Sequence, residues 1–188
     1  MTAKILVLGG DGIGPEVTTA AVTVLQAVAR IGRHTFTFTE GLIGGAALHS
    51  GHAPLPPETL ATARESDAIL LGAVGDPAFD HHPPGQRPES ALLQLRSALG
   101  LYANLRPARV WPGLERSGPL KPEILAGTDL VVVRELTGGL YYGEPRGIDA
   151  DGHSAVNTLR YTTTEITRIA HRAFALARTR RRTLVSVD

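Results

Sequence analysis

The residues of this sequence best suited to chemistry are three arginines, Arg96, Arg106 and Arg134. A guanidinium group is planar, permanently charged and able to bind a carboxylate through two parallel hydrogen bonds. Three such groups that converge would suit a small molecule with two or three carboxylates. The alternative is that all three are surface arginines, because arginine supplies all but two of the basic residues in the chain.

The first of these arginines belongs to a set of four residues with helical spacing. Glu89, Leu92, Leu93 and Arg96 fall at i, i+3, i+4 and i+7, so on a helix they share one face. An acid, two branched apolar side chains and a cation make a poor core face. They suit the wall of a pocket that binds a small anion with an apolar branch. Ser90 lies beside this set but should point away from the pocket.

Local sequence also places the other two arginines. Arg106 precedes Pro107, which favours an extended conformation where the helix has ended. Arg134 closes the apolar run Leu130–Val133, which is typical of a strand.

Strand-like and helix-like segments alternate through the chain, which predicts an α/β fold. We expect strands at Lys4–Leu8, Thr35–Thr39, Ala68–Gly72, Ala108–Trp111, Asp129–Arg134 and Thr183–Val187. We expect helices at Val17–Ala29 and Glu58–Glu65, and a last helix capped by Thr164.

The glycine-rich loop Gly9–Pro15 follows the first strand and precedes a helix. Its glycines do not have the G-x-G-x-x-G spacing of dinucleotide-binding loops. Asp11 would also put a negative charge where a pyrophosphate should lie. We therefore interpret the loop as a structural turn, with a phosphate-binding loop as the weaker alternative.

Two strand-like pieces, Leu140–Tyr142 and Ala155–Tyr161, flank turn-rich sequence and predict a hairpin at about residues 137–162. An isolated hairpin is marginally stable in water. We expect it to pair with the same hairpin of a second subunit, giving a homodimer. The alternative is that it folds back on its own domain.

Composition excludes several classes of protein. The 188 residues carry a net charge of +1, which gives no reason to expect a nucleic acid or membrane partner. The absence of cysteine excludes disulfides, thiolate catalysis and zinc–thiolate sites. No two histidines have metal-ligand spacing, and we see neither a signal peptide nor an apolar run long enough to span a bilayer. We expect a cytoplasmic protein without a metal site among these residues.

Five segments, taken in order, closely resemble the 3-isopropylmalate dehydrogenases of the β-decarboxylating dehydrogenase family. The segments are LGGDGIGPEV, LLGAVGDP, PESALLQLRSALGLYANLRPARVWPGL, VVVRELTGGLYYGEPRG and LVSVD. The resemblance implies a two-domain α/β/α sandwich unlike the Rossmann fold. It implies a first part of the large domain at residues 1–101 and an incomplete second domain at 102–188, with the hairpin as an arm.

The resemblance also implies roles for individual residues. It implies NAD-dependent oxidation and decarboxylation of 3-isopropylmalate in leucine biosynthesis, with Mg²⁺ or Mn²⁺, by a homodimer. Tyr141 would be the catalytic proton donor. The substrate would be bound by Arg96, Arg106, Arg134, Leu92 and Leu93, and the cofactor by Gly75, Asp76, Pro77 and Glu89.

The chain departs from the family pattern at its end. The resemblance implies that the catalytic lysine and the metal-binding aspartates follow Asp188, so the fold is C-terminally truncated and we expect this chain alone to be inactive. Isocitrate, homoisocitrate and tartrate dehydrogenases are alternatives within the family. The alternative to an enzyme is a non-catalytic interaction module, or pseudoenzyme, that pairs with a full-length homologue.

Overall fold

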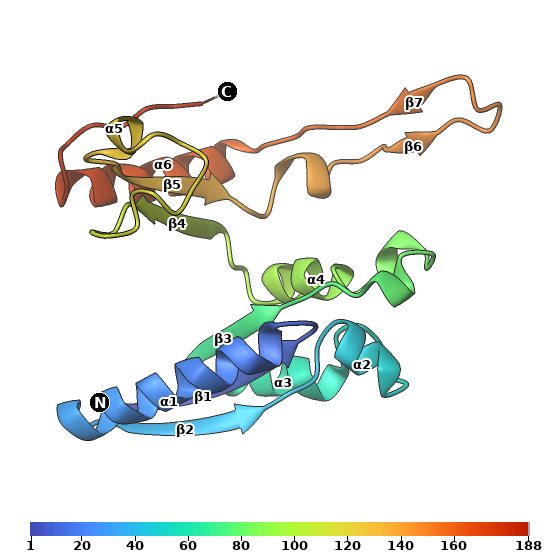
Figure 1. Ribbon diagram of the computed structural model, residues 1–188. Coiled ribbons are helices and arrows are strands. Elements are labelled where there is room, and N and C mark those ends of the chain that lie inside the picture. The colour runs from blue at the N-terminus through green and yellow to red at the C-terminus, as the bar shows by residue number, and fades with distance from the viewer. Residues whose placement is uncertain (188) are drawn as a thin grey trace. The chain divides into compact units, whose positions relative to one another are not determined.

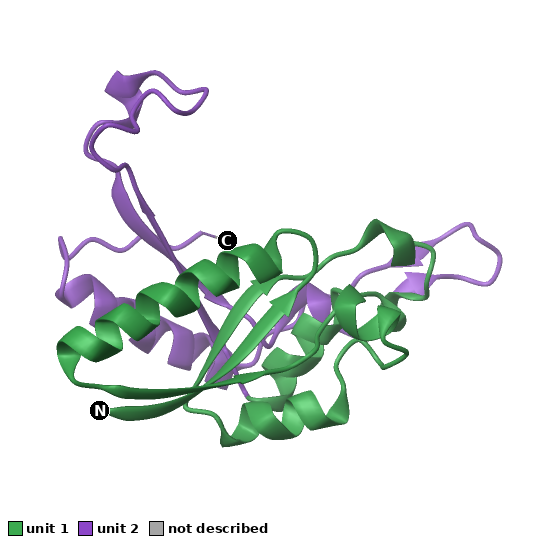
Figure 2. Ribbon diagram, turned by 60° about the horizontal axis from the view of Figure 1, so that its bottom comes forward, with its two compact units in different colours: residues 1–99 green, residues 100–188 purple. Residues whose placement is uncertain are grey.

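The computed structural model describes residues 1–187 and divides the chain into two compact units, Met1–Leu99 and Gly100–Asp188 (Figure 2). Unit 1 is built on a three-stranded parallel sheet with the order β2-β1-β3. Its strands are β1 (Thr2–Gly10), β2 (Thr35–Glu40) and β3 (Ala68–Ala73) (Figure 1). The three strands expected in this part of the sequence are therefore confirmed.

The helices of unit 1 lie against this sheet. They are α1 (Gly14–Gly32), α2 (Gly45–His49), α3 (Pro57–Glu65) and α4 (Ser90–Ala98), with the short 3₁₀ turns η1 (Pro77–Phe79) and η2 (Pro84–Gln86) between β3 and α4. Helix α1 packs along all three strands, whereas α2 and α3 contact β1. Both faces of β1 are thus covered, which agrees with its unbroken apolar sequence.

The core of unit 1 forms around the central strand. Leu6 and Leu8 of β1 have no exposed surface and pack with Ile43, with Ala63 of α3 and with Leu95 of α4. Burial of one leucine side chain contributes about 1.5–3 kcal/mol. The apolar contacts therefore fix α4, the helix that carries Arg96, to the sheet.

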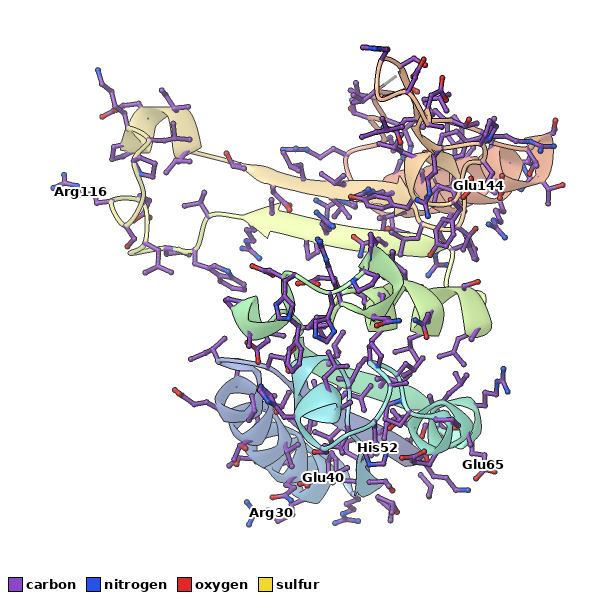
Figure 3. The ribbon with its side chains drawn as sticks, turned by 90° about the vertical axis from the view of Figure 1, so that its right-hand side faces the viewer. Arg30, Glu40, His52, Glu65, Arg116 and Glu144 are labelled. Atoms are coloured by element: carbon purple, nitrogen blue, oxygen red, sulfur yellow. The ribbon has the colours of Figure 1, made fainter. Side chains whose placement is uncertain are left out.

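Unit 2 contains the antiparallel pair β4 (Ala103–Arg109) and β5 (Asp129–Glu135). The loop between them includes the short helix α5 (Pro122–Leu125), and Arg116 extends outward from this loop (Figure 3). The chain then forms η3 (Gly139–Tyr141), the small antiparallel hairpin β6 (Gly147–Ile148) and β7 (Ala155–Val156), and the helix α6 (Thr163–Arg178), which packs against β5.

Several expected elements of unit 2 are wrong in position or type. The strand expected at Ala108–Trp111 begins at Ala103 and ends at Arg109, so Arg106 and Pro107 lie inside it. Within the described part of the chain this sheet has two strands, and a strand with an open edge tolerates proline. Leu140–Tyr142 is not a strand, because the chain turns through η3 there.

The hairpin is also shorter than expected, because β7 ends at Val156 rather than at Tyr161. Residues 183–187 form no strand. Instead the segment before them is held by Arg180, whose Nη2 lies 2.7 Å from Asp129 Oδ1 at the start of β5. This ion pair lowers the pKa of the Asp129 carboxyl group.

The cap of α6 is Thr162 rather than Thr164. The Thr162 hydroxyl accepts a hydrogen bond from the Glu165 backbone N–H, and the Glu165 side chain accepts one from the Thr162 N–H. This reciprocal pair satisfies two backbone donors, whereas Thr164 has no acid at the matching position. None of the helices described between residues 1 and 187 is long and apolar enough to cross a membrane.

Candidate active site

The strand pairing of unit 2 brings two of the predicted arginines to one face. Asn104 lies opposite Arg134, and Arg106 lies opposite Val132. Residues directly opposite each other in an antiparallel pair share a face, as do residues two apart along a strand. Asn104, Arg106, Val132 and Arg134 therefore line the same face of the β4–β5 sheet, and the two arginines are exposed there.

The guanidinium group of Arg106 is oriented by its neighbour on the strand. Arg106 Nε donates a hydrogen bond of 2.7 Å to Asn104 Oδ1. This contact engages the Nε–H and leaves the terminal nitrogens as donors for a ligand. An arginine held in this way loses less conformational entropy when it binds an anion.

Tyr141 lies beside the second arginine of this face. The Arg134 Cζ atom is 5.5 Å from the centre of the Tyr141 ring, and Tyr141 as a residue is 53% exposed. The Tyr141 backbone carbonyl accepts a 2.9 Å hydrogen bond from Arg146 Nη1. A phenol thus lies next to one cation, Arg134, that is suited to binding a carboxylate.

The turn that leads to Tyr141 is organised by Glu135, the last residue of β5. Its carboxylate accepts hydrogen bonds from the backbone N–H groups of Thr137 (2.6 Å) and Gly138 (2.8 Å), and from Arg168 of α6 (2.7 Å). Burial alone would raise the pKa of Glu135. The hydrogen bonds from Gly138, Arg168 and Thr137 together outweigh it and lower the pKa below its usual value.

Gly139 is required by the packing of this turn. Its φ is +79°, a conformation that residues with a side chain rarely adopt, and a Cβ atom there would overlap the Tyr161 hydroxyl group. The Gly139 N–H donates to the Arg160 carbonyl oxygen at 2.8 Å. The start of η3 is therefore tied to the segment that enters α6.

The other predicted substrate residues lie on α4 in unit 1. Leu92, Leu93 and Arg96 are each half-buried, whereas Ala91 and Leu95 on the opposite side of the helix enter the core. The expected mixed face thus exists and is separate from the core face of α4. Glu89 occupies the N-cap position and is exposed.

The predicted cofactor residues lie between β3 and α4. A Cβ atom placed at Gly75, whose φ is +149°, would be 3.2 Å from Glu89 Oε1, so the structure brings these two residues together. Pro77 begins η1, and Asp76 caps it by accepting a 2.9 Å hydrogen bond from the Ala78 N–H.

Asp76 also has a partner that the sequence did not indicate. His49 Nε2 of α2 lies 2.8 Å from Asp76 Oδ2. The hydrogen bond from Ala78, followed by that from His49, lowers the pKa of Asp76. This contact links α2 to the loop that carries the predicted cofactor residues.

The side chain of Asp11 ties the glycine-rich loop after β1 to α2 and to the loop after β3. The buried Asp11 carboxylate accepts hydrogen bonds from the backbone N–H groups of Gly45 (2.9 Å), Ala46 (2.7 Å) and Gly75 (2.9 Å). The aspartate thus occupies the position at the start of α2 that an anion would take. The structural turn expected from the sequence matches this arrangement.

Three residues that position the site could not be singled out from the sequence. They are Asn104, Glu135 and Arg168. Asn104 is meaningful only once the register of β4 is known, and Arg168 contacts Glu135 across 33 residues. Glu135 carried a weak signal, because an acid at the end of an apolar strand and before a Thr-Gly-Gly turn is a candidate for capping backbone N–H groups.

Among residues 1–187, no three histidine or acidic side chains gather in a way that could hold a metal ion. The described residues therefore do not fit the Mg²⁺ or Mn²⁺ that the resemblance implies.

Comparison with known proteins identifies the family. The family described as isocitrate/isopropylmalate dehydrogenase matches residues 4–188. The 3-isopropylmalate dehydrogenase of Aquifex aeolicus is 54% identical over 98% of this chain and 51% of its own length. That of Shouchella clausii is 56% identical over 100% of this chain and 52% of its own length.

Solved structures agree with this result. Isocitrate dehydrogenase from Methylococcus capsulatus superposes with a TM-score of 0.75 at 33% identity, covering 94% of this chain and 48% of its own. A β-decarboxylating dehydrogenase from Thermococcus kodakarensis gives a TM-score of 0.64 at 36% identity, covering 94% and 46%. These structures confirm the predicted fold class, and the chain spans about half the length of the curated relatives it matches. The chain belongs to the isocitrate/isopropylmalate dehydrogenase family.

Proposed function

We propose that this chain supplies the substrate-carboxylate and proton-donor part of a dehydrogenase that acts on 3-isopropylmalate. One observation carries the proposal. Arg106 and Arg134 share a face of the β4–β5 sheet with Tyr141 beside Arg134, in a chain more than half identical to proteins named 3-isopropylmalate dehydrogenase.

In the proposed reaction, Arg106 and Arg134 of unit 2 bind carboxylate groups of the substrate. Arg96 of α4 stays a predicted substrate residue of unit 1. The bound NAD⁺ would supply the acceptor for the hydride that leaves C2 while the hydroxyl proton goes to a base. Loss of carbon dioxide from C3 leaves an enolate, and the Tyr141 phenol donates its proton to C3. Arg134 places positive charge beside the phenol and stabilises the phenolate that forms.

For the cofactor, we propose contacts from Gly75, Asp76, Pro77 and Glu89 on the loop before α4. The glycine loop after β1 is a poor candidate, because its glycines lack the G-x-G-x-x-G spacing and it carries the acidic Asp11. No step of the proposal passes through a metal ion, since the described residues offer no site for one.

The substrate branch is proposed to be apolar. Leu92 and Leu93 supply branched side chains on the mixed face of α4. The Ser90 hydroxyl has the backbone oxygens of Arg87 (2.7 Å) and Gly85 (3.0 Å) within hydrogen-bond distance, so its single O–H is already engaged. A third carboxylate, as in isocitrate, would find two leucines rather than a free donor here.

Calorimetry on the purified chain tests this proposal. We expect saturable binding of 3-isopropylmalate that is about tenfold tighter than binding of isocitrate, because the leucines favour the isopropyl group. In the presence of NAD⁺ and Mn²⁺ we expect no NADH, since the described residues include no metal site. Equal or tighter binding of isocitrate would favour an isocitrate dehydrogenase homologue, and NADH formation would contradict the proposed inactivity.

A second candidate is a non-catalytic module that pairs with a full-length homologue through the hairpin. The observation in its favour is that Ile148 of β6, Val156 of β7 and the nearby Leu159 are exposed. Light scattering of the chain with and without the Aquifex aeolicus enzyme separates the possibilities. A mixed dimer supports this module, a homodimer of the chain supports pairing between its own arms, and a monomer in both samples contradicts both.

A further inference from the structure

The side chain of Arg168 connects α6 to the end of strand β5. Its Nη2 atom lies 2.7 Å from Glu135 Oε1 and also contacts Thr137 Oγ1. Its Cζ atom lies 4.7 Å from the centre of the Tyr102 ring. Arg168 thus makes polar and cation–π contacts at once, which fixes the guanidinium group more firmly than a single surface ion pair would.

Glu135, which Arg168 holds in place, binds the backbone of the turn that follows it. The Glu135 side chain is only 7% exposed, and it accepts hydrogen bonds from the N–H groups of Thr137 and Gly138 and from the Thr137 hydroxyl (2.8 Å). The turn leads directly into η3, whose last residue is Tyr141. One carboxylate therefore sets the direction in which the chain leaves β5.

Glu135 and Arg134 are consecutive residues of β5, so their side chains project to opposite faces of the sheet. Glu135 is held on the face of the sheet that meets Arg168 of α6, so Arg134 projects from the other face, which also carries Arg106. Glu135 also sets the point from which Tyr141 returns to lie under Arg134, with 5.5 Å between Cζ and the ring centre.

We infer that Arg168 and Glu135 are positioning residues that hold Arg134 and Tyr141 together in the arrangement the proposed reaction requires. The catalytic purpose given to this arrangement rests on the proposed function. The arrangement of Arg134 and Tyr141 itself can be measured without a ligand. Neither Arg168 nor Glu135 lies on the face that carries Arg106 and Arg134. Both therefore act through the turn that joins β5 to η3.

Fluorine NMR of the full chain labelled with fluorotyrosine tests the inference directly. The four tyrosines give four resonances, and the Tyr141→Phe variant assigns the one of interest. In the otherwise unaltered chain, Arg134→Gln should shift the Tyr141 resonance, because the cation leaves the ring. In the Arg168→Met background, the same substitution should no longer shift it, because the two groups have already separated.

Arg172→Met is the matched control, because Arg172 lies one turn further along α6 and is exposed. In that background the Arg134→Gln shift should keep its size. Thr137→Val is a second, milder test, because it removes the hydroxyl that contacts Glu135 and Arg168. It should reduce the shift that Arg134→Gln causes. Circular dichroism confirms that each variant is folded before its spectrum is used.

The inference is overturned if the Tyr141 resonance still responds to Arg134→Gln in folded Arg168→Met or Thr137→Val chains as it does in wild type. A separate calorimetric series distinguishes this failure from failure of the proposed function. Arg168→Met should weaken binding of 3-isopropylmalate about tenfold. If the wild-type chain binds none while the fluorine coupling is present, the proposed function fails and the positioning role stands.

Discussion

The guanidinium group of Arg134 lies over the ring of Tyr141, with 5.5 Å between Cζ and the ring centre. Arg134 belongs to β5 and Tyr141 to η3, and the turn between them is held by the Glu135 carboxylate. A fixed cation beside a phenol is useful where the phenol must give up a proton. The relationship therefore joins the packing of unit 2 to the chemistry proposed for it.

Replacing Asn104 with alanine tests whether Arg106 is oriented in advance. The Arg106 Nε–H then loses its acceptor, and the guanidinium group samples more conformations. A hydrogen bond of this kind contributes about 0.5–1.5 kcal/mol, so binding of 3-isopropylmalate should weaken by about two- to tenfold. Calorimetry measures the affinity, with Asn157→Ala in the exposed arm as the control. Unchanged affinity would show that Arg106 needs no such support.

Replacing Gly139 with alanine should destabilise unit 2. The positive φ costs about 1 kcal/mol for a residue with a Cβ atom, and the overlap with Tyr161 adds to it. Gly152→Ala is a matched control, because Gly152 has a φ of +73° but no atom within 4 Å of the added carbon. Urea denaturation should show a clearly larger loss for Gly139→Ala. Equal losses in the free energy of unfolding would mean that the Tyr161 side chain moves away from the added carbon without destabilising the fold.

Replacing Asp11 with alanine should destabilise unit 1. Three backbone N–H groups lose their acceptor, and hydrogen bonds to a charged group contribute about 1.5–3 kcal/mol each before the structure relaxes. We expect a net loss of about 3 kcal/mol in the free energy of unfolding. Asp80→Ala, at an exposed carboxylate, is the control and should have little effect. A loss no greater than that of the control would refute the role given to Asp11.

The contact between His49 and Asp76 predicts a pH dependence. The pKa of Asp76 is lowered first by the Ala78 N–H and then by His49, so its carboxylate stabilises the folded state at pH values above its unfolded pKa of about 3.9. That contribution is lost as the pH falls through the lower, folded pKa. In His49→Ala, carboxyl-carbon NMR should show the Asp76 pKa rising towards, but not reaching, its usual value. An unchanged pKa would show that Ala78 alone accounts for the shift.

The sequence predicts the elements that rest on continuous apolar patterns. Leu6 and Leu8 identify β1, because a parallel strand covered on both faces has little room for polar residues. The structural turn expected at Gly9–Pro15 agrees with the structure, but the sequence did not show that the Asp11 carboxylate would bind N–H groups of Gly45, Ala46 and Gly75.

Predictions failed where a specific hydrogen-bond partner, rather than local propensity, decides the structure. Residues 183–187 have a strand-like composition but form no strand, because strand propensity alone provides no neighbour for the backbone hydrogen bonds. Leu140–Tyr142 became a 3₁₀ turn because the Glu135 carboxylate binds the N–H groups before it. The cap at Thr162, by contrast, could have been found, since Glu165 stands three residues after it.

The candidate site likewise contains residues that could be predicted from the sequence and residues that could not. Residue type singled out the arginines, because few other groups bind carboxylates in this way. Tyr141 came only from the resemblance to the family. The support given by Asn104 and Arg168 depends on strand register and on the packing of α6, which local sequence does not determine.

The most direct test of the account is calorimetric binding of 3-isopropylmalate to the wild-type chain and to three arginine variants. Arg106→Gln and Arg134→Gln should each weaken binding by about tenfold or more, because each removes a charge-assisted contact with a carboxylate. Arg109→Gln removes a cation from the opposite face of the same strand, where its guanidinium lies by Trp111, and should leave the affinity unchanged. Equal affinities for all four proteins, or no binding by the wild-type chain, would contradict the account.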